Sequence, residues 1–251
     1  ALKADHFLHL RLEIVDPHML GLFEPLMSEP TLRLVSFMDH TPGQRQWHDL
    51  DRFRSFSLGR DVSSEEEFQA LVARRVQDQR EHAGRQRADV LRLLQGHPAV
   101  RASHDDMTPE HVAEAQACGC TISEFPTTIA AARAARAGGM GIVMGAPNLV
   151  IGGSHSGNVS AAELVEHGLL DVFSSDYVPA SLLHAAFMLH EGFGIPMPEA
   201  IAPVTRTPAN LVGMTDRGRL GPGLRADLVR VREVGTAPTV VAVWREGQRI
   251  A

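Results

Sequence analysis

The chain has 251 residues, of which 44% are hydrophobic and 22% are charged, and its formal net charge at pH 7 is −6. A chain of this length and composition can bury one substantial core, which excludes a disordered or fibrous protein. The acidic balance, 24 basic against 30 acidic residues, gives no overall attraction for nucleic acid or an anionic membrane surface. No apolar run is long enough to span a bilayer, so we expect a soluble protein.

The two cysteines are expected to be packing residues. Cys118 and Cys120 are separated by one residue, a spacing that disfavours a disulfide between them. Their apolar neighbours favour core packing in a reducing compartment over a metal-binding pair.

The first residues, Ala1 to Asp5, show no signal-peptide pattern and lead at once into a strand pattern, so we expect that further sequence precedes them.

Strand and helix patterns alternate from the start of the chain to His190. Apolar runs or period-2 alternation predict strands at residues 8–14, 32–38, 99–103, 121–125, 141–145 and 171–175. Helical spacing between them predicts helices at 19–27, twice over 47–95, from the N-cap Thr108 onward, and at 127–137, 161–166 and 179–190. Strand followed by helix, repeated in this way, implies a parallel sheet covered by helices.

The predicted fold class is therefore α/β. A TIM-like (β/α)8 barrel needs eight strand–helix units, so about two N-terminal units are missing from this sequence if the chain forms that fold. Residues 226–231 and 239–250 look instead like antiparallel strands joined near Gly235 and Pro238, part of a small β-sandwich. We predict a catalytic barrel domain over residues 1–215 and sandwich strands over 216–251.

Four predicted strands end in or near a side chain that can bind a metal ion: Glu13, His40, His104 and Asp176. Active sites of parallel barrels lie at the carboxyl ends of the strands, so these side chains are expected to converge. Imidazole and carboxylate ligands suit one or two divalent ions of Zn, Mn or Fe, which make water a nucleophile near neutral pH. Asp176 is predicted also to be the catalytic base. Taken singly, each histidine could instead hydrogen-bond a loop, and the remaining histidines are interpreted as structural.

A glycine-rich loop over residues 152–158 could bind phosphate. Its backbone N–H groups can cradle phosphate oxygens, although a turn of small residues explains the composition equally well. The polar side chains of this loop are Ser154, His155, Ser156 and Asn158. Gln44 and Arg45 follow His40, and a guanidinium suits bidentate contact with phosphate. We predict that these side chains contact the substrate.

Longer motifs resemble one family. They occur in order at residues 35–46, 102–106, 124–128, 144–148, 152–158 and 174–183. These motifs look like successive signatures of the α-D-ribose 1-methylphosphonate 5-triphosphate diphosphatase family, within the amidohydrolase superfamily. The residues 218–223 and 226–229 also resemble the general amidohydrolase ending, so the resemblance runs from the first strand to the C-terminus.

The resemblance implies a cytoplasmic, metal-dependent hydrolase of the carbon–phosphorus lyase pathway. Such an enzyme converts a phosphorylated sugar, the ribose triphosphate, to its 5-phosphate and releases diphosphate. The motifs add Asn148 and Tyr177 to the expected substrate contacts, and a homo-oligomer is compatible with them. Two features depart from the family: the His-x-Asp or His-x-His motif of the first barrel strand is not in this sequence, and the strand ending at Glu124 lacks a histidine.

Two other functions stay open. A deacetylase or cyclic amidase acting on a C–N bond would use the same fold, although the phosphate-friendly loop disfavours it. A non-catalytic barrel fragment that acts as a scaffold is supported by the missing first metal motif. Metal content, and the release of diphosphate rather than an amine, would separate these functions.

Overall fold

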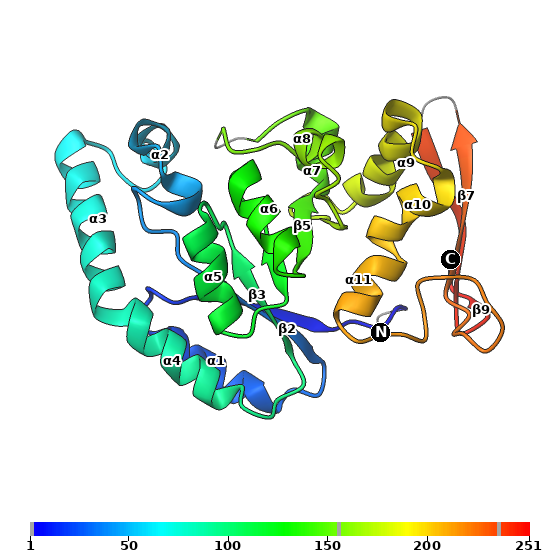
Figure 1. Cartoon of the computed structure of the whole chain (residues 1–251), viewed down its shortest axis with the longest axis horizontal. Helices are drawn as coiled ribbons and strands as arrows, with labels where there is room; N and C mark the ends of the chain where they lie inside the picture. The colour runs from blue at the N-terminus through cyan, green and yellow to red at the C-terminus, as the bar shows by residue number, and fades with distance from the viewer. Residues whose placement is uncertain (1–2, 155–156, 235–236) are drawn as a thin grey trace. The chain divides into compact units, whose positions relative to one another are not determined.

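The computed structural model describes residues 3–154, 157–234 and 237–251, which form two compact units. The N-terminal unit comprises Phe7–Met140 and Ser154–Val159. The C-terminal unit comprises Ala1–His6, Gly141–Gly153 and Ser160–Ala251. Strands and helices alternate in both units as the sequence predicts (Figure 1).

Four parallel strands form the sheet of the N-terminal unit, in the order β1-β2-β3-β4. They are β1 (Leu8–Glu13), β2 (Leu32–Met38), β3 (Val100–His104) and β4 (Ile122–Glu124). The register places Glu13 beside Met38 and His104 beside Glu124. Because these are the last residues of their strands, the carboxyl ends of all four strands share one edge.

The N-terminal unit contains nine described helical segments. They are α1 (Met19–Phe23), η1 (Glu24–Ser28), η2 (Arg45–Trp47), α2 (Leu50–Ser57), α3 (Glu65–Asp78), η3 (Gln79–Ala83), α4 (Gly84–Leu93), α5 (Pro109–Ala117) and α6 (Ile129–Ala137). The predicted N-cap is confirmed, since the side chain of Thr108 accepts a hydrogen bond from the backbone N–H of His111. The predicted helix pair over 47–95 is a longer series in which α3 continues through a π-helical turn, η3, into α4.

Two apolar clusters hold this unit together. Alanines on α6, among them Ala131 and Ala135, are fully buried, and their small side chains let α5 and α6 lie side by side (Figure 1). A separate cluster joins α2 to α3 through Phe53, Phe68 and Leu71. The second cluster makes the helical segment after β2 a packed structure rather than a pair of independent solvated helices.

The C-terminal unit contains two parallel strands and a small antiparallel sheet. Its elements are β5 (Gly141–Gly145), α7 (Ala146–Ile151), α8 (Ala161–Glu166), β6 (Val172–Ser174), α9 (Ser181–Phe193), α10 (Met197–Ile201), η4 (Ala202–Val204), α11 (Arg206–Leu211), β7 (Leu228–Val234), β8 (Ala237–Arg245) and β9 (Gln248–Arg249). Strand β5 pairs with β6, and the order of the small sheet is β7-β8-β9. The predicted antiparallel strands are thus confirmed, although Gly235 lies outside the described residues. The predicted domain boundary after residue 215 falls inside this unit and stays a prediction.

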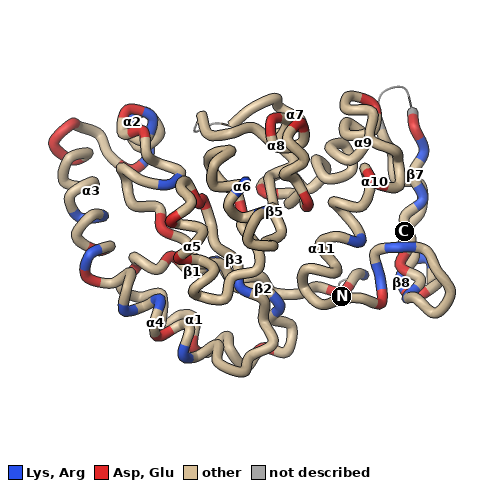
Figure 2. The backbone as a smooth tube through the Cα atoms, in the orientation of Figure 1, with Lys and Arg blue, Asp and Glu red and all other residues tan. Residues whose placement is uncertain are grey.

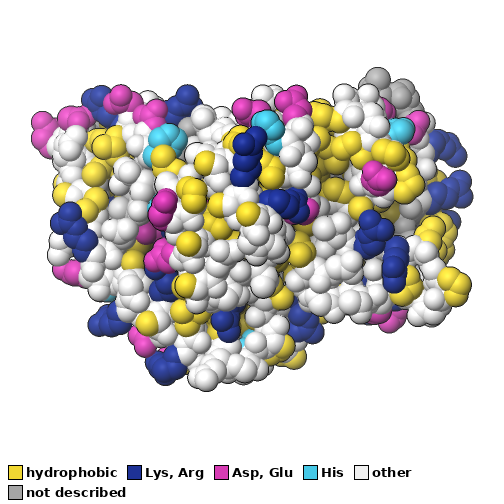
Figure 3. Space-filling view, viewed as in Figure 1, with side chains coloured by type: hydrophobic (Ala, Val, Ile, Leu, Met, Phe, Trp, Pro, Cys, Tyr) yellow, Lys and Arg dark blue, Asp and Glu magenta, His cyan; other side chains and the backbone are white. Residues whose placement is uncertain are grey.

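The surface is mixed in character. On the face shown in Figure 3, basic and acidic side chains are interspersed with apolar ones over the region of α3. Among the described helices, none combines the length and apolar character needed to cross a membrane.

Candidate metal centre

Glu13 and His40 meet at the carboxyl ends of β1 and β2. The carboxylate of Glu13 accepts hydrogen bonds from the backbone N–H of His40 at 3.0 Å and from its Nδ1 at 2.5 Å. The parallel register accounts for the contact, because Glu13 lies opposite Met38, two residues before His40. A carboxylate at Nδ1 fixes the imidazole tautomer that leaves Nε2 free to accept a proton or bind an ion.

His104 and Asp105 lie beside this pair. His104 ends β3, and Asp105 follows it with φ +54°, a left-handed conformation that non-glycine residues rarely adopt. Asp105 Oδ2 lies 2.8 Å from His104 Nδ1 and 3.5 Å from His40 Nε2. His40, His104 and Asp105 offer ligand atoms that all lie within 4.8 Å of one another. The structure therefore brings together three of the predicted ligands and adds Asp105.

Arg11 holds the other side of His104. Its Nη2 lies 2.9 Å from His104 Nε2, and its Nε donates to the sulfur of Met38 at 3.2 Å. A guanidinium can only donate, so Nε2 of His104 is the acceptor. His104 thus sits between a cation at Nε2 and a carboxylate at Nδ1, and Arg11 must withdraw before His104 binds an ion through Nε2.

The carboxylates keep His40 charged. Burial alone lowers the pKa of His40, but Asp105 and Glu13 outweigh it and raise the pKa to about 9. Burial alone raises the pKa of Asp105, but the neighbouring His104 and His40 hold it below its usual value. Near neutral pH the cluster is therefore a set of carboxylates around a protonated imidazole, and a divalent cation would take the place of that proton.

Two buried atoms of the cluster fit a metal ion. His104 Nδ1 and Asp105 Oδ2 form an ion-pair contact at 2.8 Å, and neither atom has a hydrogen-bond partner among the described residues. A buried polar atom without a partner costs on the order of 1–3 kcal/mol. Coordination would satisfy both atoms once the Nδ1 proton of His104 has left, and imidazole nitrogen with carboxylate oxygen is a donor set that suits Zn, Mn or Fe.

A second polar group lies nearer the start of the same strands. His9 Nε2 is 2.5 Å from Ser36 Oγ, which donates to Glu124 Oε2 at 2.5 Å. Burial is the main reason that the pKa of His9 is lowered. The polar side chains of β1 therefore face the same space as those of β2, β3 and β4, and Glu124 contacts Ser36 rather than the metal cluster.

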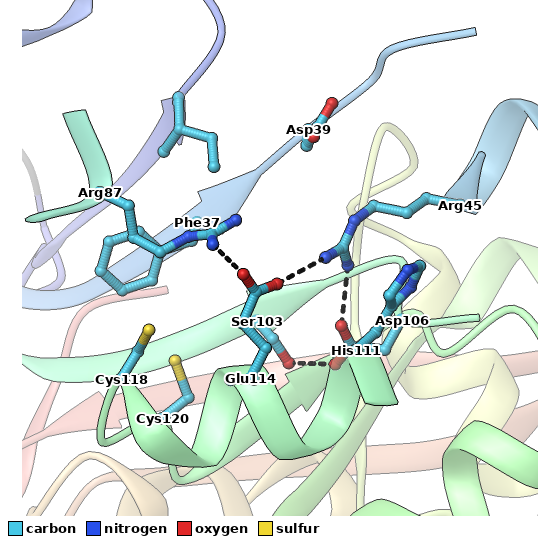
Figure 4. Close-up of a pocket in the computed structure, with 12 residues that line it drawn as sticks. Phe37, Asp39, Arg45, Arg87, Ser103, Asp106, His111, Glu114, Cys118 and Cys120 are labelled. Atoms are coloured by element: carbon cyan, nitrogen blue, oxygen red, sulfur yellow. Dashed lines mark hydrogen bonds and ion pairs between the residues drawn. The ribbon is translucent and has the colours of Figure 1, made fainter. Parts of the chain in front are cut away.

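Arg45 belongs to a buried ion-pair network. Its Nη1 donates to Asp106 Oδ1 at 2.8 Å and to the backbone carbonyl of His104 at 3.1 Å. Figure 4 shows the guanidinium directed at Asp106 and Glu114. Arg45 is only 8% exposed, and Asp106 is fully buried. The predicted contact between Arg45 and phosphate stays a prediction, and it would require these bonds to break.

The cysteines line the same small pocket as Arg45 (Figure 4). Cys120 is buried and Cys118 is half-buried, and both are free thiols. Burial raises the pKa of the Cys120 thiol to about 12. A thiol of this kind is an unreactive core residue, in line with the packing role expected from the sequence.

Comparison with known proteins decides the family. The chain matches the amidohydrolase family over residues 70–251. It is 44% identical over 257 residues to the alpha-D-ribose 1-methylphosphonate 5-triphosphate diphosphatase of Escherichia coli (strain K12), covering 99% of this chain and 66% of that protein. The chain belongs to the amidohydrolase family. Members of this family are metal-dependent hydrolases, and the α/β barrel class predicted from the sequence is confirmed by the membership.

Two further similarities are more distant. The imidazolonepropionase of Ruegeria sp. (strain TM1040) is 40% identical over 72 residues, which cover 27% of this chain and 18% of that protein. A crystal structure of a Xaa-Pro dipeptidase with bound methionine in its active site has a TM-score of 0.48 and 14% identity, covering 98% of this chain and 86% of that chain. The chain thus spans about two-thirds of the length of its E. coli relative and a small part of the imidazolonepropionase.

Gln44, one of the predicted phosphate contacts, is hydrogen-bonded within the protein near the candidate metal centre. Gln44 Nε2 donates to Asp39 Oδ2 at 2.9 Å, and Gln79 donates to the same oxygen at 3.1 Å. Asp39 also accepts from the backbone N–H of Thr41 at 3.0 Å. Gln44 therefore stabilises the turn after β2, and its substrate contact stays a prediction.

In the described part of the glycine-rich loop, the side-chain oxygen of Asn158 is unsatisfied. Asn158 Oδ1 is buried and has no hydrogen-bond partner among the described residues, and the carbonyl of Ser154 accepts from the backbone N–H of Gly157 at 3.2 Å. Gly157 has φ +71°, and a Cβ there would lie 2.4 Å from the guanidinium carbon of Arg52. His155 and Ser156 lie outside the described residues. Phosphate binding by this loop stays a prediction.

Three predicted site residues lie in the C-terminal unit. Asp176 is exposed, two residues after β6, with φ +47°, which is an unusual conformation often found at functional sites. Asn148 Oδ1 accepts a hydrogen bond from the backbone N–H of Ala161 at 2.8 Å and so joins α7 to the start of α8. Tyr177 is 56% exposed. The predicted roles of all three stay predictions.

Sequence reasoning missed Asp105 and Arg11. Asp105 directly follows His104 at a strand end, and successive strand residues usually point to opposite faces, so the strand pattern does not indicate both as ligands. The left-handed turn at Asp105 removes that alternation. Arg11 lies on β1, and only the register of β1 with β2 and β3 shows that it reaches His104.

Proposed function

We propose that the protein hydrolyses α-D-ribose 1-methylphosphonate 5-triphosphate to the 5-phosphate and diphosphate, in the carbon–phosphorus lyase pathway. The observation that carries this proposal is the 44% identity, over 99% of the chain, to the E. coli diphosphatase. The grouping of His40, His104 and Asp105 at the strand ends supports it, because the family's chemistry needs a metal ion there. The two free cysteines agree with a cytoplasmic enzyme.

The metal centre would hold one or two divalent ions of Zn, Mn or Fe. His40, His104 and Asp105 are proposed ligands, and Glu13, which orients His40 through Nδ1, is the fourth. The ion, when bound, acts as a Lewis acid and activates water near neutral pH. Asp176 is the proposed base that accepts the proton of the attacking water.

The reaction replaces one P–O bond with another. The water oxygen bonds to the α-phosphorus, and the bond from that phosphorus to the oxygen bridging to the β-phosphorus breaks. Diphosphate leaves with the bridging oxygen, and the added oxygen stays on the 5-phosphate. Gln44, Asn148, Tyr177 and the loop residues Ser154, His155, Ser156 and Asn158 are the proposed substrate contacts.

Arg45 supports the site in this proposal rather than binding phosphate. Its hydrogen bond to the carbonyl of His104 and its ion pair with Asp106 hold the end of β3, from which both His104 and Asp105 project. The ligand geometry at the metal centre would then depend on a buried cation that does not touch substrate.

A substrate panel tests the proposal. The purified protein is stripped with a chelator, reloaded separately with Zn, Mn or Fe, and offered the ribose triphosphate, a hydantoin and an N-acetylated sugar. We expect metal-dependent release of diphosphate from the first compound alone. Hydrolysis of the hydantoin or the acetamide, with no diphosphate release, would assign the chain to C–N chemistry. No turnover of any compound by the metal-loaded protein would favour a scaffold.

A further inference from the structure

A pocket of about 960 Å³ lies beside the metal centre, within the N-terminal unit. Glu13 and His40 form one part of its lining, and the other lining residues that are described all come from residues 47–75. Its volume lies within the range of about 300–1,000 Å³ that is typical of ligand pockets. The helical segment after β2 is therefore a wall of the candidate active site.

Packed aromatic rings hold this wall in place. The ring of Trp47 lies 5.4 Å from that of Phe53 and 4.8 Å from that of Phe56, measured between centroids. Phe53 lies 5.8 Å from Phe68 of α3, and both belong to the buried cluster that joins α2 to α3. Because the interior of this wall is packed, α2 and α3 are held against each other, and the residues on the pocket face project from a fixed backbone.

One face of α3 runs along the pocket. Glu67, Leu71 and Arg74 all line it, and their spacing of four and then three residues places them on one side of a helix. Arg75 lines the pocket as well. Figure 2 shows that α3 is acidic at its first turn and basic farther along. Of the described residues that line the pocket, Arg74 and Arg75 are the ones that carry a guanidinium.

The guanidinium groups of Arg74 and Arg75 can bind a ligand without losing a protein contact, unlike those of Arg45 and Arg54. Within the described part of the chain, the guanidinium groups of Arg74 and Arg75 have no hydrogen bond or ion pair. By contrast, Arg54 pairs with Glu65 at 2.6 Å, and Arg45 is bound to Asp106. A pair of unpaired guanidinium groups facing one pocket is suited to phosphate oxygens, which each planar fork can bind in bidentate fashion.

We propose that Arg74 and Arg75 bind the polyphosphate end of the substrate, the two phosphoryl groups that leave as diphosphate. The inference rests on the proposed function for the identity of the substrate. Asp61 and Glu67 also line the pocket and would repel phosphate, so the polyphosphate lies toward the arginine end of α3. Two cations placed at the leaving group also stabilise the charge that develops on diphosphate as the bond breaks.

A direct binding measurement tests this without relying on turnover. Inorganic triphosphate is titrated calorimetrically into the metal-loaded wild type, Arg74→Ala/Arg75→Ala and Arg74→Lys/Arg75→Lys. The matched control is Arg80→Ala/Arg85→Ala, which removes two exposed arginines of the same helical run that do not line the pocket. We expect at least tenfold weaker binding in the double alanine variant, an intermediate loss with lysine, and wild-type binding in the control.

The outcomes of this titration test the binding site independently of the proposed reaction. Unchanged binding in the double alanine variant, or equal loss in the control, would overturn it and leave the arginines as helix-end charges that complement the dipole. Failure of the folded wild type to bind triphosphate would overturn it too. If wild type binds triphosphate through these arginines yet releases no diphosphate from the ribose triphosphate, the binding site stands and the proposed reaction is wrong.

Discussion

Asp105 Oδ2 lies 2.8 Å from His104 Nδ1, although neighbouring residues at a strand end usually direct their side chains to opposite faces. The left-handed backbone of Asp105 turns its carboxylate back toward His104 and His40. The strained residue thus supplies the one carboxylate that contacts both histidines. Strain of about 1–3 kcal/mol at such a residue is tolerated where the surrounding structure fixes it.

Removing the central ligands should abolish metal binding. We expect His104→Ala and Asp105→Asn to lose the bound ion, measured by elemental analysis after dialysis, because each removes a donor of the three-residue group. Glu13→Gln should weaken metal affinity by about 10–100-fold, since Glu13 contacts His40 at the nitrogen away from Asp105. Glu110→Gln, an exposed change at the start of α5, is the control and should keep its full metal content.

Metal affinity should rise with pH up to about 9. In the metal-free protein the pKa of His40 is raised from 6.5 to about 9, so His40 is protonated at neutral pH and must lose a proton to bind an ion. The apparent affinity should increase roughly tenfold per pH unit between pH 7 and pH 9 and then level off. Titration with a chromophoric chelator as competitor measures this. A flat profile over that interval would show that His40 is not a ligand.

The same shift affects the stability of the metal-free protein. Because the pKa of His40 is higher in the folded chain than in the unfolded one, its contribution is complete below pH 6.5 and is lost as the pH rises toward 9. Urea unfolding of the metal-free protein should therefore give a lower free energy of unfolding at pH 9 than at pH 6.5. His40→Gln should remove the part of this difference in unfolding free energy that comes from the titration of His40.

Arg45 is predicted to matter for stability. Arg45→Met leaves the buried carboxylate of Asp106 without its cation and should lower the free energy of unfolding by about 3–5 kcal/mol. Arg54→Met breaks an ion pair whose side chains are both about half exposed and should cost less than about 1 kcal/mol. Urea denaturation compares the two. Equal, small losses of unfolding free energy in the two variants would contradict a structural role for Arg45 and favour its predicted contact with the substrate.

The metal site could be predicted from the sequence to the extent that it lies on strand ends. Glu13, His40 and His104 follow apolar runs, and a parallel sheet brings such positions to one edge whatever their separation in the chain. Asp105 could not be predicted in the same way, because its side chain reaches the site only through a backbone conformation that the sequence pattern does not reveal.

The role of Arg45 and the packing of residues 47–75 could not be predicted from the sequence. A guanidinium after a strand end is equally suited to phosphate and to a buried carboxylate, and only the fold shows that Asp106 lies 2.8 Å away. The helices after β2 carry many charges, which is typical of a solvated surface. Their burial against each other through Phe53 and Phe68, and the pocket that they line, depend on tertiary packing.

Loosening the pocket wall should leave the metal centre intact. Phe68→Ala removes a ring that is 3% exposed from the cluster joining α2 to α3, and we expect a loss of about 3–5 kcal/mol. Phe7→Ala, at a residue that is 40% exposed, should cost about 1 kcal/mol or less. Metal content should stay at the wild-type level in both, measured at a temperature where both are folded. Loss of the ion in Phe68→Ala alone would show that the wall also supports the ligands.

The position of bond cleavage distinguishes attack of water at the α-phosphorus from attack at the other two phosphorus atoms. The metal-loaded protein is given the ribose 5-triphosphate in water enriched in ¹⁸O, and the products are identified by ³¹P NMR. The account predicts diphosphate without label and a 5-phosphate that carries one ¹⁸O atom, because water attacks the α-phosphorus. Release of orthophosphate with a 5-diphosphate, or label in the diphosphate, would contradict it.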